Sequence, residues 1–138
     1  MKLYKKVLVF GVFDCLHPGH FSFLRQAKKY GTLMVAVARD SSVKKLKNKK
    51  PAQSEKQRVA VLKKSFPKMS IFLGDKILGS YTVIKTQKPD IICLGYDQTG
   101  LAEDLAKKIK MRKPPKIRIV ILKPFKSEKF KSSLLYQA

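Results

Sequence analysis

Residues 7–31 read VLVFGVFDCLHPGHFSFLRQAKKYG, and this stretch decides which class of fold the chain adopts. Its first four residues are a continuous run of aliphatic and aromatic side chains, as expected for a strand buried on both faces. From Pro18 the pattern becomes helical, because Phe21, Leu24 and Ala27 recur at intervals of three and Gly31 supplies a C-terminal stop. The stretch therefore predicts a buried strand, a loop and a helix, in that order.

The rest of the chain repeats this alternation. Apolar runs predict further strands at 33–38, 71–73, 90–94 and 117–122, and helical patterns fall at 54–66, 81–87, 99–110 and 132–136. Ser54 is the expected N-cap of the helix that it opens, with Gln57 as its capping-box partner, whereas the polar, Lys-rich residues 40–53 are expected to form a loop. Such an alternation predicts an α/β fold, a Rossmann-like three-layer sandwich with a five-stranded parallel sheet, in a single domain over residues 1–138.

The composition is strongly basic. Lys and Arg number 31 against 9 Asp and Glu, and the formal net charge of +22 implies a polyanionic partner. No apolar run approaches the length of a membrane span, so we expect no membrane association. The two cysteines, Cys15 and Cys93, have neither metal-ligand spacing nor the pattern of a disulfide framework, which favours a cytoplasmic protein.

The candidate ligand site lies where the first strand meets the first helix. In an open parallel sheet, ligands bind beyond the carboxyl ends of the strands, and this rule brings residues 11–20, 38–50 and 95–98 to one cleft. A helix N-terminus favours phosphate, because its N–H groups are unpaired and its dipole is positive there. His17 and His20 are three residues apart and share one side of the first turn, and Gly19 leaves room for a phosphate. Alternatively, the two histidines only cap the helix.

These residues also carry a resemblance to a known family. The segment from Gly11 to His20 resembles the Gly-[Thr/Val]-Phe-Asp-x-x-His-x-Gly-His signature of cytidylyltransferase-like nucleotidyltransferases. Within that family the chain is most similar to archaeal-type FAD synthases and glycerol-3-phosphate cytidylyltransferases. Residues 38–51 resemble the Lys-bearing loop of the FAD synthases, Glu55 and Arg58 match a Glu-x-x-Arg pattern, and residues 95–98 resemble their Gly-Tyr-Asp-Gln segment. The chain departs from the family near its end, where Lys131 precedes the two hydroxyl residues instead of following them.

The resemblance implies a role for each matching residue. The implied catalytic residues are His17, His20, Lys44 and Lys45; the implied nucleotide-binding residues are Gly11, Val12, Phe13, Asp14, Gly19, Gly95, Asp97, Gln98, Ser132 and Ser133; and the acceptor phosphate is assigned to Lys47 and Arg58. Structural alternatives stay open: a solvated basic loop for the lysines, an N-cap role for the serines, and a helix-capping turn for residues 95–98. We expect Mg²⁺ to arrive with the nucleoside triphosphate, with no metal site built by the protein.

Three hypotheses follow for the function. The first is transfer of AMP from ATP to FMN, giving FAD and pyrophosphate. The second is transfer of CMP from CTP to glycerol phosphate or a similar alcohol phosphate. The third is a basic nucleic-acid-binding module without catalysis, which the scattered lysines and the absence of RNA-binding aromatic motifs disfavour. By analogy with relatives, the chain is expected to form a homodimer.

Overall fold

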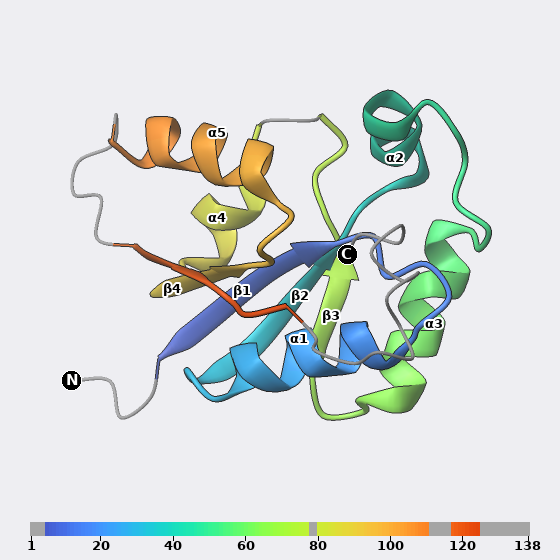
Figure 1. Cartoon of the computed structure of the whole chain (residues 1–138), viewed down its shortest axis with the longest axis horizontal. Helices are drawn as coiled ribbons and strands as arrows, with labels where there is room; N and C mark the ends of the chain where they lie inside the picture. Colours follow the sequence, from blue (N-terminus) through green and yellow to red (C-terminus); the bar gives the residue numbers. More distant parts are fainter. Residues whose placement is uncertain (1–4, 78–79, 111–116, 125–138) are drawn as a thin grey trace.

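The computed structural model describes residues 5–77, 80–110 and 117–124, and within them strands and helices alternate along the chain (Figure 1). The strands are β1 (Lys6–Gly11), β2 (Thr32–Val37), β3 (Ser70–Leu73), β4 (Ile91–Leu94) and β5 (Arg118–Ile121). The helices are α1 (Pro18–Lys28), α2 (Asp40–Lys47), α3 (Glu55–Ser65), α4 (Thr82–Gln87) and α5 (Thr99–Lys110). The predicted helix over residues 132–136 lies outside the described residues.

All strand pairs are parallel, and the sheet runs in the order β3-β2-β1-β4-β5. The predicted α/β fold with a five-stranded parallel sheet is therefore confirmed. The chain leaves β1 in one direction, toward β2 and β3, and later returns to the other side of β1 with β4. This reversal of strand order lies between β1 and β4, the type of position where open α/β sheets bind their ligands.

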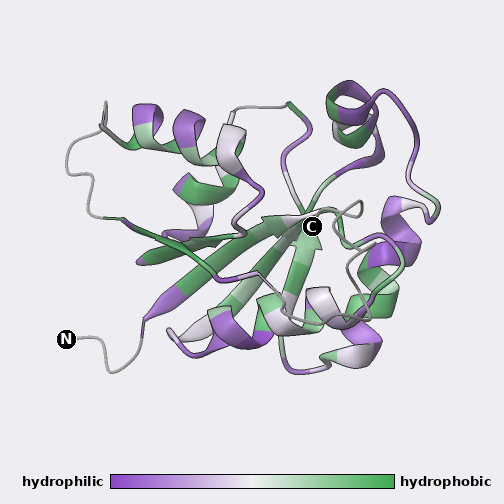
Figure 2. Cartoon of the chain, in the orientation of Figure 1, coloured by the Kyte–Doolittle hydropathy of each residue, from purple (hydrophilic) through white to green (hydrophobic). Residues whose placement is uncertain are grey.

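Two hydrophobic clusters fill the space between the layers. On one face of the sheet, residues of α1 and α3 such as Leu24 and Leu62 pack against β1, β2 and β3. On the other face, Val83 and Ile84 of α4 and Leu105 of α5 cover the opposite side of the strands. Because both faces are covered, the strands are mostly apolar after their first residues, as the green colouring of their central parts in Figure 2 shows. The third layer of the predicted sandwich is thus present.

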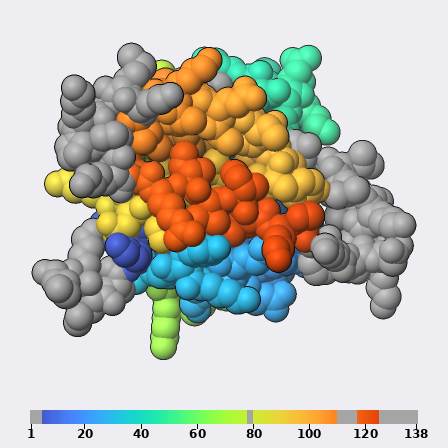
Figure 3. All heavy atoms as spheres, turned by 60° about the vertical axis from the view of Figure 1, so that its left-hand side comes forward, coloured from blue at the N-terminus to red at the C-terminus, as the bar shows by residue number. Residues whose placement is uncertain are grey.

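The edge of the sheet formed by β5 lies at the surface. In Figure 3, its residues are seen between α5 and α1. Ile121 is 54% exposed there, whereas all four residues of β4 are buried. None of the helices within the described ranges combines the length and the apolarity needed to cross a membrane. Cys15 is exposed, Cys93 is buried in β4, and both are free thiols.

The prediction of a loop over residues 40–53 is wrong for its first half, because residues 40–47 form α2. Sequence periodicity missed this helix because only Ser42 and Val43 are buried, which is too few residues for an apolar stripe. Its stability comes from other sources: Asp40 in the first turn and lysines in the last turn complement the helix dipole. Asn48, with a φ of 56°, ends the helix in the left-handed conformation.

The predicted start of α3 is confirmed. The Ser54 side chain accepts a hydrogen bond from the Gln57 N–H at 3.2 Å, and the Gln57 side chain accepts one from the Ser54 N–H at 2.9 Å.

We expect Ser54→Ala to lower the free energy of unfolding by about 1 kcal/mol, because the first turn loses its cap. Urea denaturation followed by circular dichroism measures this change. Ser65→Ala, at the exposed last residue of the same helix, is the matched control and should leave the midpoint unchanged.

Candidate active site

The two histidines cap α1 reciprocally. His17 is the N-cap residue, and its Nδ1 accepts a hydrogen bond from the Gly19 N–H at 3.1 Å. In return, Nδ1 of His20 accepts a hydrogen bond from the His17 N–H at 3.3 Å. The two rings stack with their centroids 3.9 Å apart and their planes at 30°. The pair therefore shares one side of the first turn, as the spacing predicted, and the capping interpretation is correct for the Nδ1 atoms.

This capping leaves a proton donor on the far side of each ring. An imidazole nitrogen that accepts a backbone N–H carries no proton, so the hydrogen-bond pattern assigns the proton of each neutral ring to Nε2. The ring of His20 is 2% exposed, and its Nε2 is buried with no hydrogen-bond partner among the described residues. A buried donor in this state is costly unless an acceptor arrives, so the arrangement suits an anionic ligand.

Both rings are held in the neutral form. Burial lowers the pKa of His17, and burial together with the charge of His17 and of Lys47 lowers the pKa of His20 to about 3, against an opposing effect of Asp14. A neutral pair avoids placing two positive charges 3.9 Å apart at the positive end of the helix dipole. The rings therefore act as hydrogen-bond donors, and the positive charge that a phosphate requires must come from other side chains.

Two glycines and a phenylalanine hold this pair in place. A Cβ at Gly19 would lie 2.8 Å from Cε1 of His17, and a Cβ at Gly11 would lie 2.6 Å from the Phe13 ring. Phe13 is fully buried, has a φ of 53°, and packs its ring 5.5 Å from that of His20. The space beside Gly19, where a phosphate was expected, therefore contains the His17 ring. The Phe13 ring packs against the His20 ring, and Gly11 leaves space for the Phe13 ring.

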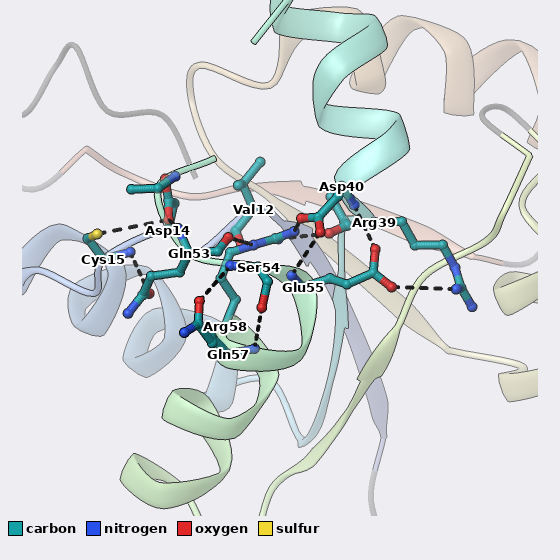
Figure 4. Close-up of polar contacts among 12 residues, drawn as sticks. Val12, Asp14, Cys15, Arg39, Asp40, Gln53, Ser54, Glu55, Gln57 and Arg58 are labelled. Carbon is teal, nitrogen blue, oxygen red and sulfur yellow. Dashed lines mark hydrogen bonds and ion pairs between the residues drawn. The ribbon is translucent and has the colours of Figure 1, made fainter. Parts of the chain in front are cut away.

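Asp14 connects the histidine loop (residues 12–17) to the segment that follows α2 (Figure 4). Its carboxylate accepts hydrogen bonds from the Ala52 N–H at 2.7 Å and the Gln53 N–H at 2.9 Å. The Cys15 N–H donates back to Oε1 of Gln53 at 3.1 Å. These contacts use Asp14 to join two loops, whereas the resemblance had suggested contact with the nucleotide.

Arg58, predicted to bind the acceptor phosphate, is buried and directs its described donors at oxygen atoms of the protein. Its side chain is 0% exposed and donates to the carbonyls of Val12, Ala38 and Gln53, at 2.9, 2.7 and 3.1 Å. Its remaining described contact is an ion pair with Asp40 at 2.6 Å. Val12, predicted to bind the nucleotide, is 9% exposed and contributes this carbonyl contact. Sequence spacing could not distinguish a phosphate-binding arginine from one directed into the backbone.

Sequence reasoning missed the roles of Asp40 and Arg39, which complete this network (Figure 4). Asp40 and Glu55 exchange hydrogen bonds, each carboxylate accepting the backbone N–H of the other at 2.9 and 3.2 Å. Arg39 pairs with Glu55 at 3.8 Å and donates to the Gly74 carbonyl beyond β3 at 2.8 Å. The positions of these residues could be read from the sequence, because Arg39 and Asp40 follow β2 and Glu55 opens α3. Their pairing could not be read from the sequence, because it depends on tertiary contact.

The three lysines assigned to the reaction all lie on α2 and are exposed. Of these, the charge of Lys47 contributes to the low pKa of His20, as the smallest of the named effects on it. Lys44 and Lys45 lie one turn or less before it on the same helix. All three lysines therefore stay candidates for binding a phosphate.

At the reversal of strand order, Gln98 links the ends of β1 and β4. Its side chain donates to the Phe10 carbonyl at 2.9 Å and accepts from the Gly95 N–H at 2.8 Å. A Cβ at Gly95 would lie 2.8 Å from Oδ1 of Asp97, so a side chain there would require the Asp97 carboxylate to move. The backbone of Gln98 opens α5, since its carbonyl accepts the Ala102 N–H. The helix-capping alternative fits Gly95 and Gln98, and the partly exposed Asp97 carboxylate lies beside this turn.

Two residues that were predicted to bind the nucleotide, Ser132 and Ser133, lie outside the described residues. Among residues 5–77, 80–110 and 117–124, no group of three His, Cys, Asp or Glu side chains is placed to hold a metal ion.

The low pKa of His20 predicts a specific loss of stability in acid. Above pH 6.5 the ring is neutral in both the folded and the unfolded chain, so it contributes no pH dependence. Below pH 6.5 the unfolded chain gains a proton and the folded chain does not until about pH 3, so stability falls. Between pH 6.5 and pH 5, His20 should cost about 2 kcal/mol of unfolding free energy.

Urea denaturation at pH 7, 6 and 5 tests this prediction. His20→Gln should reduce the acid-dependent loss by most of that amount, because glutamine does not titrate. Equal slopes in the wild type and the variant would show that His20 takes up its proton as readily in the folded protein as in the unfolded chain.

Comparison with known proteins agrees with this geometry. The cytidylyltransferase-like family model matches residues 8–137. The FAD synthase of Aciduliprofundum boonei is 40% identical over 121 residues, which cover 87% of this chain and 79% of that protein. The FAD synthase of Pyrococcus horikoshii is 42% identical over 106 residues, covering 76% of this chain and 72% of that protein.

A solved structure is similar over almost the same range. The crystal structure of the lipopolysaccharide core biosynthesis protein from Thermoplasma volcanium superposes with a TM-score of 0.73 at 32% identity, covering 89% of this chain and 99% of that chain. The reciprocal histidine cap, the parallel sheet that presents it, and a family match over residues 8–137 establish that the chain belongs to the cytidylyltransferase-like family and is a nucleotidyltransferase.

Proposed function

We propose that the chain transfers AMP from ATP to FMN and so forms FAD and pyrophosphate. The observation that carries the proposal is the pair of neutral Nε2–H donors at the N-terminus of α1, in a chain similar to proteins named FAD synthase. The site suits a reaction whose charge develops on phosphate oxygens, since it offers donors and a helix N-terminus without a strong base.

The reaction needs little proton chemistry from the protein. A phosphate oxygen of FMN attacks the α-phosphorus of ATP, a new P–O bond forms, and the bond to the β-phosphate oxygen breaks as pyrophosphate leaves. The attacking oxygen is already anionic, so no side chain has to remove a proton from it. His17 and His20 donate through Nε2 to the crowded α-phosphate, and Lys47 supplies positive charge beside His20. Mg²⁺ enters with the triphosphate as part of that substrate.

Direct assay tests the choice of nucleotide and acceptor. Purified protein should release pyrophosphate and form FAD with ATP and FMN, and FAD formation is measured by chromatography with fluorescence detection. The control reaction contains CTP and glycerol phosphate. Turnover with that pair and none with ATP and FMN would replace the proposed reaction with the cytidylyl transfer. Tight RNA binding without any triphosphate turnover would instead support the nucleic-acid-binding module.

The role of the histidine pair predicts the effect of Gly19→Ala. The added methyl group would lie 2.8 Å from Cε1 of His17 and must displace that ring. We expect kcat to fall roughly a hundredfold, the loss typical of removing one donor to a developing oxyanion. Steady-state kinetics measure this change.

Gly100→Ala is the matched control for that variant. A Cβ at Gly100, in the first turn of α5, would meet nothing within 4 Å, so its kcat should equal that of the wild type. Full activity in Gly19→Ala would mean that the position of the His17 ring does not limit turnover.

A further inference from the structure

Arg58 touches the segments that carry the histidine pair and the α2 lysines. Its Nη1 donates to the Val12 carbonyl, at the start of the histidine loop, and to the Ala38 carbonyl, at the end of β2. Its Nε donates to the Gln53 carbonyl, in the segment that Asp14 also holds. Its Nη2 pairs with Asp40, the first residue of α2. One buried guanidinium therefore connects the histidine loop with the beginning of α2 and with the segment after it (Figure 4).

The α2 helix needs such an attachment. Its buried residues are Ser42 and Val43, both in its first half, so packing holds the helix near its N-terminal end. Lys47 lies seven residues after Asp40, a distance of about 10 Å along the helix axis. A small rotation at Asp40 therefore moves the Lys47 ammonium by several times as much as it moves the attachment point. The orientation of Lys47 depends on how firmly Asp40 is fixed.

Asp40 is fixed through its backbone and its side chain together. Its N–H donates to Glu55, and one carboxylate oxygen accepts the Glu55 N–H. The other oxygen lies 2.6 Å from Nη2 of Arg58, whose own side chain is fully buried. Removing either member of a pair between a buried arginine and a carboxylate leaves the other charge uncompensated, so the pair keeps the two groups together. Arg58 thus sets the direction in which α2 leaves β2.

We propose that Arg58 is a positioning residue that acts on turnover through Asp40 and Lys47, by fixing the orientation of α2 and of the lysine that this helix carries. The proposal rests on the proposed function of Lys47 at the phosphates. It assigns Arg58 no contact with substrate, because its side chain is buried and its described donors bind protein oxygens. It predicts that the effect of breaking the Arg58–Asp40 pair disappears when Lys47 is already absent.

A double-mutant cycle tests this dependence. Asp40→Asn removes the carboxylate charge at a partly exposed position, and Lys47→Met removes the ammonium. We expect Lys47→Met to lower kcat about a hundredfold and Asp40→Asn to lower it about tenfold. In the Lys47→Met background, Asp40→Asn should change kcat by less than about twofold, because interacting sites are not additive. Arg58→Lys keeps the positive charge but loses the planar guanidinium with its several N–H donors. It should change kcat in the same way as Asp40→Asn in both backgrounds.

Two controls separate positioning from a general loss of structure. Glu103→Gln makes the same change of charge at an exposed position of α5 and should leave kcat unchanged in both backgrounds. Thermal unfolding of every variant shows that the compared proteins are folded at the assay temperature. A merely structural role of Arg58 would lower kcat by the same factor with and without Lys47. That additive result, or a Lys47→Met variant with unchanged kcat, would overturn the proposal.

The same cycle distinguishes this proposal from the proposed reaction. If the wild type forms no FAD from ATP and FMN, the acceptor assignment fails, and the cycle is read instead on the Kd of ATP and of CTP by calorimetry. Every nucleotidyltransferase reaction requires triphosphate binding, so coupling between Asp40 and Lys47 in those Kd values would support the positioning role without the FMN reaction. Additive changes in Kd would overturn it.

Discussion

The reciprocal cap of α1 by His17 and His20 is the interaction on which the site depends. A helix N-terminus has backbone N–H groups without partners, and side-chain acceptors normally satisfy them through oxygen. Here two imidazole Nδ1 atoms fill that role, and an imidazole that accepts at one nitrogen donates at the other. The same contacts that cap the N-terminus of the helix thus fix both rings as Nε2 donors. Gly19, Gly11 and Phe13 make this arrangement sterically possible.

Neutral rings divide the work of binding an anion between two kinds of side chain. The histidines offer directional Nε2–H donors, and burial lowers the pKa of both rings, that of His20 to about 3. The lysines of α2 provide the charge, but they are exposed, so salt screens their attraction for a distant substrate. The net charge of +22 favours association with polyanions in general, whereas the histidine donors are directional.

Several polar residues at the strand ends bind other loops of the protein. Asp14 holds the segment after α2, Arg58 holds three carbonyls, and Gln98 closes the gap between β1 and β4. Loops at the carboxyl edge of a parallel sheet have few backbone partners of their own, so side chains must supply them. A site built in this way is rigid because its loops are attached to one another. In the part of the chain that the structure describes, the candidate functional groups at this edge of the sheet include the two imidazoles, the α2 lysines and Asp97.

The sequence alone determined the order of the elements, the parallel sheet, the histidine pair and the cap of α3, because each depends on local periodicity or on spacing within one turn. It did not determine α2, since a short helix that buries only Ser42 and Val43 has no apolar stripe to detect. It also could not predict the intramolecular contacts of Gly19, Asp14, Arg58 or Gln98. Their partners are a neighbouring ring or backbone groups up to 88 residues away, and only the folded chain decides which of these comes within hydrogen-bonding distance. Local physics chose the elements and the donors, and tertiary packing decided which polar side chains face the ligand and which hold the loops that carry it.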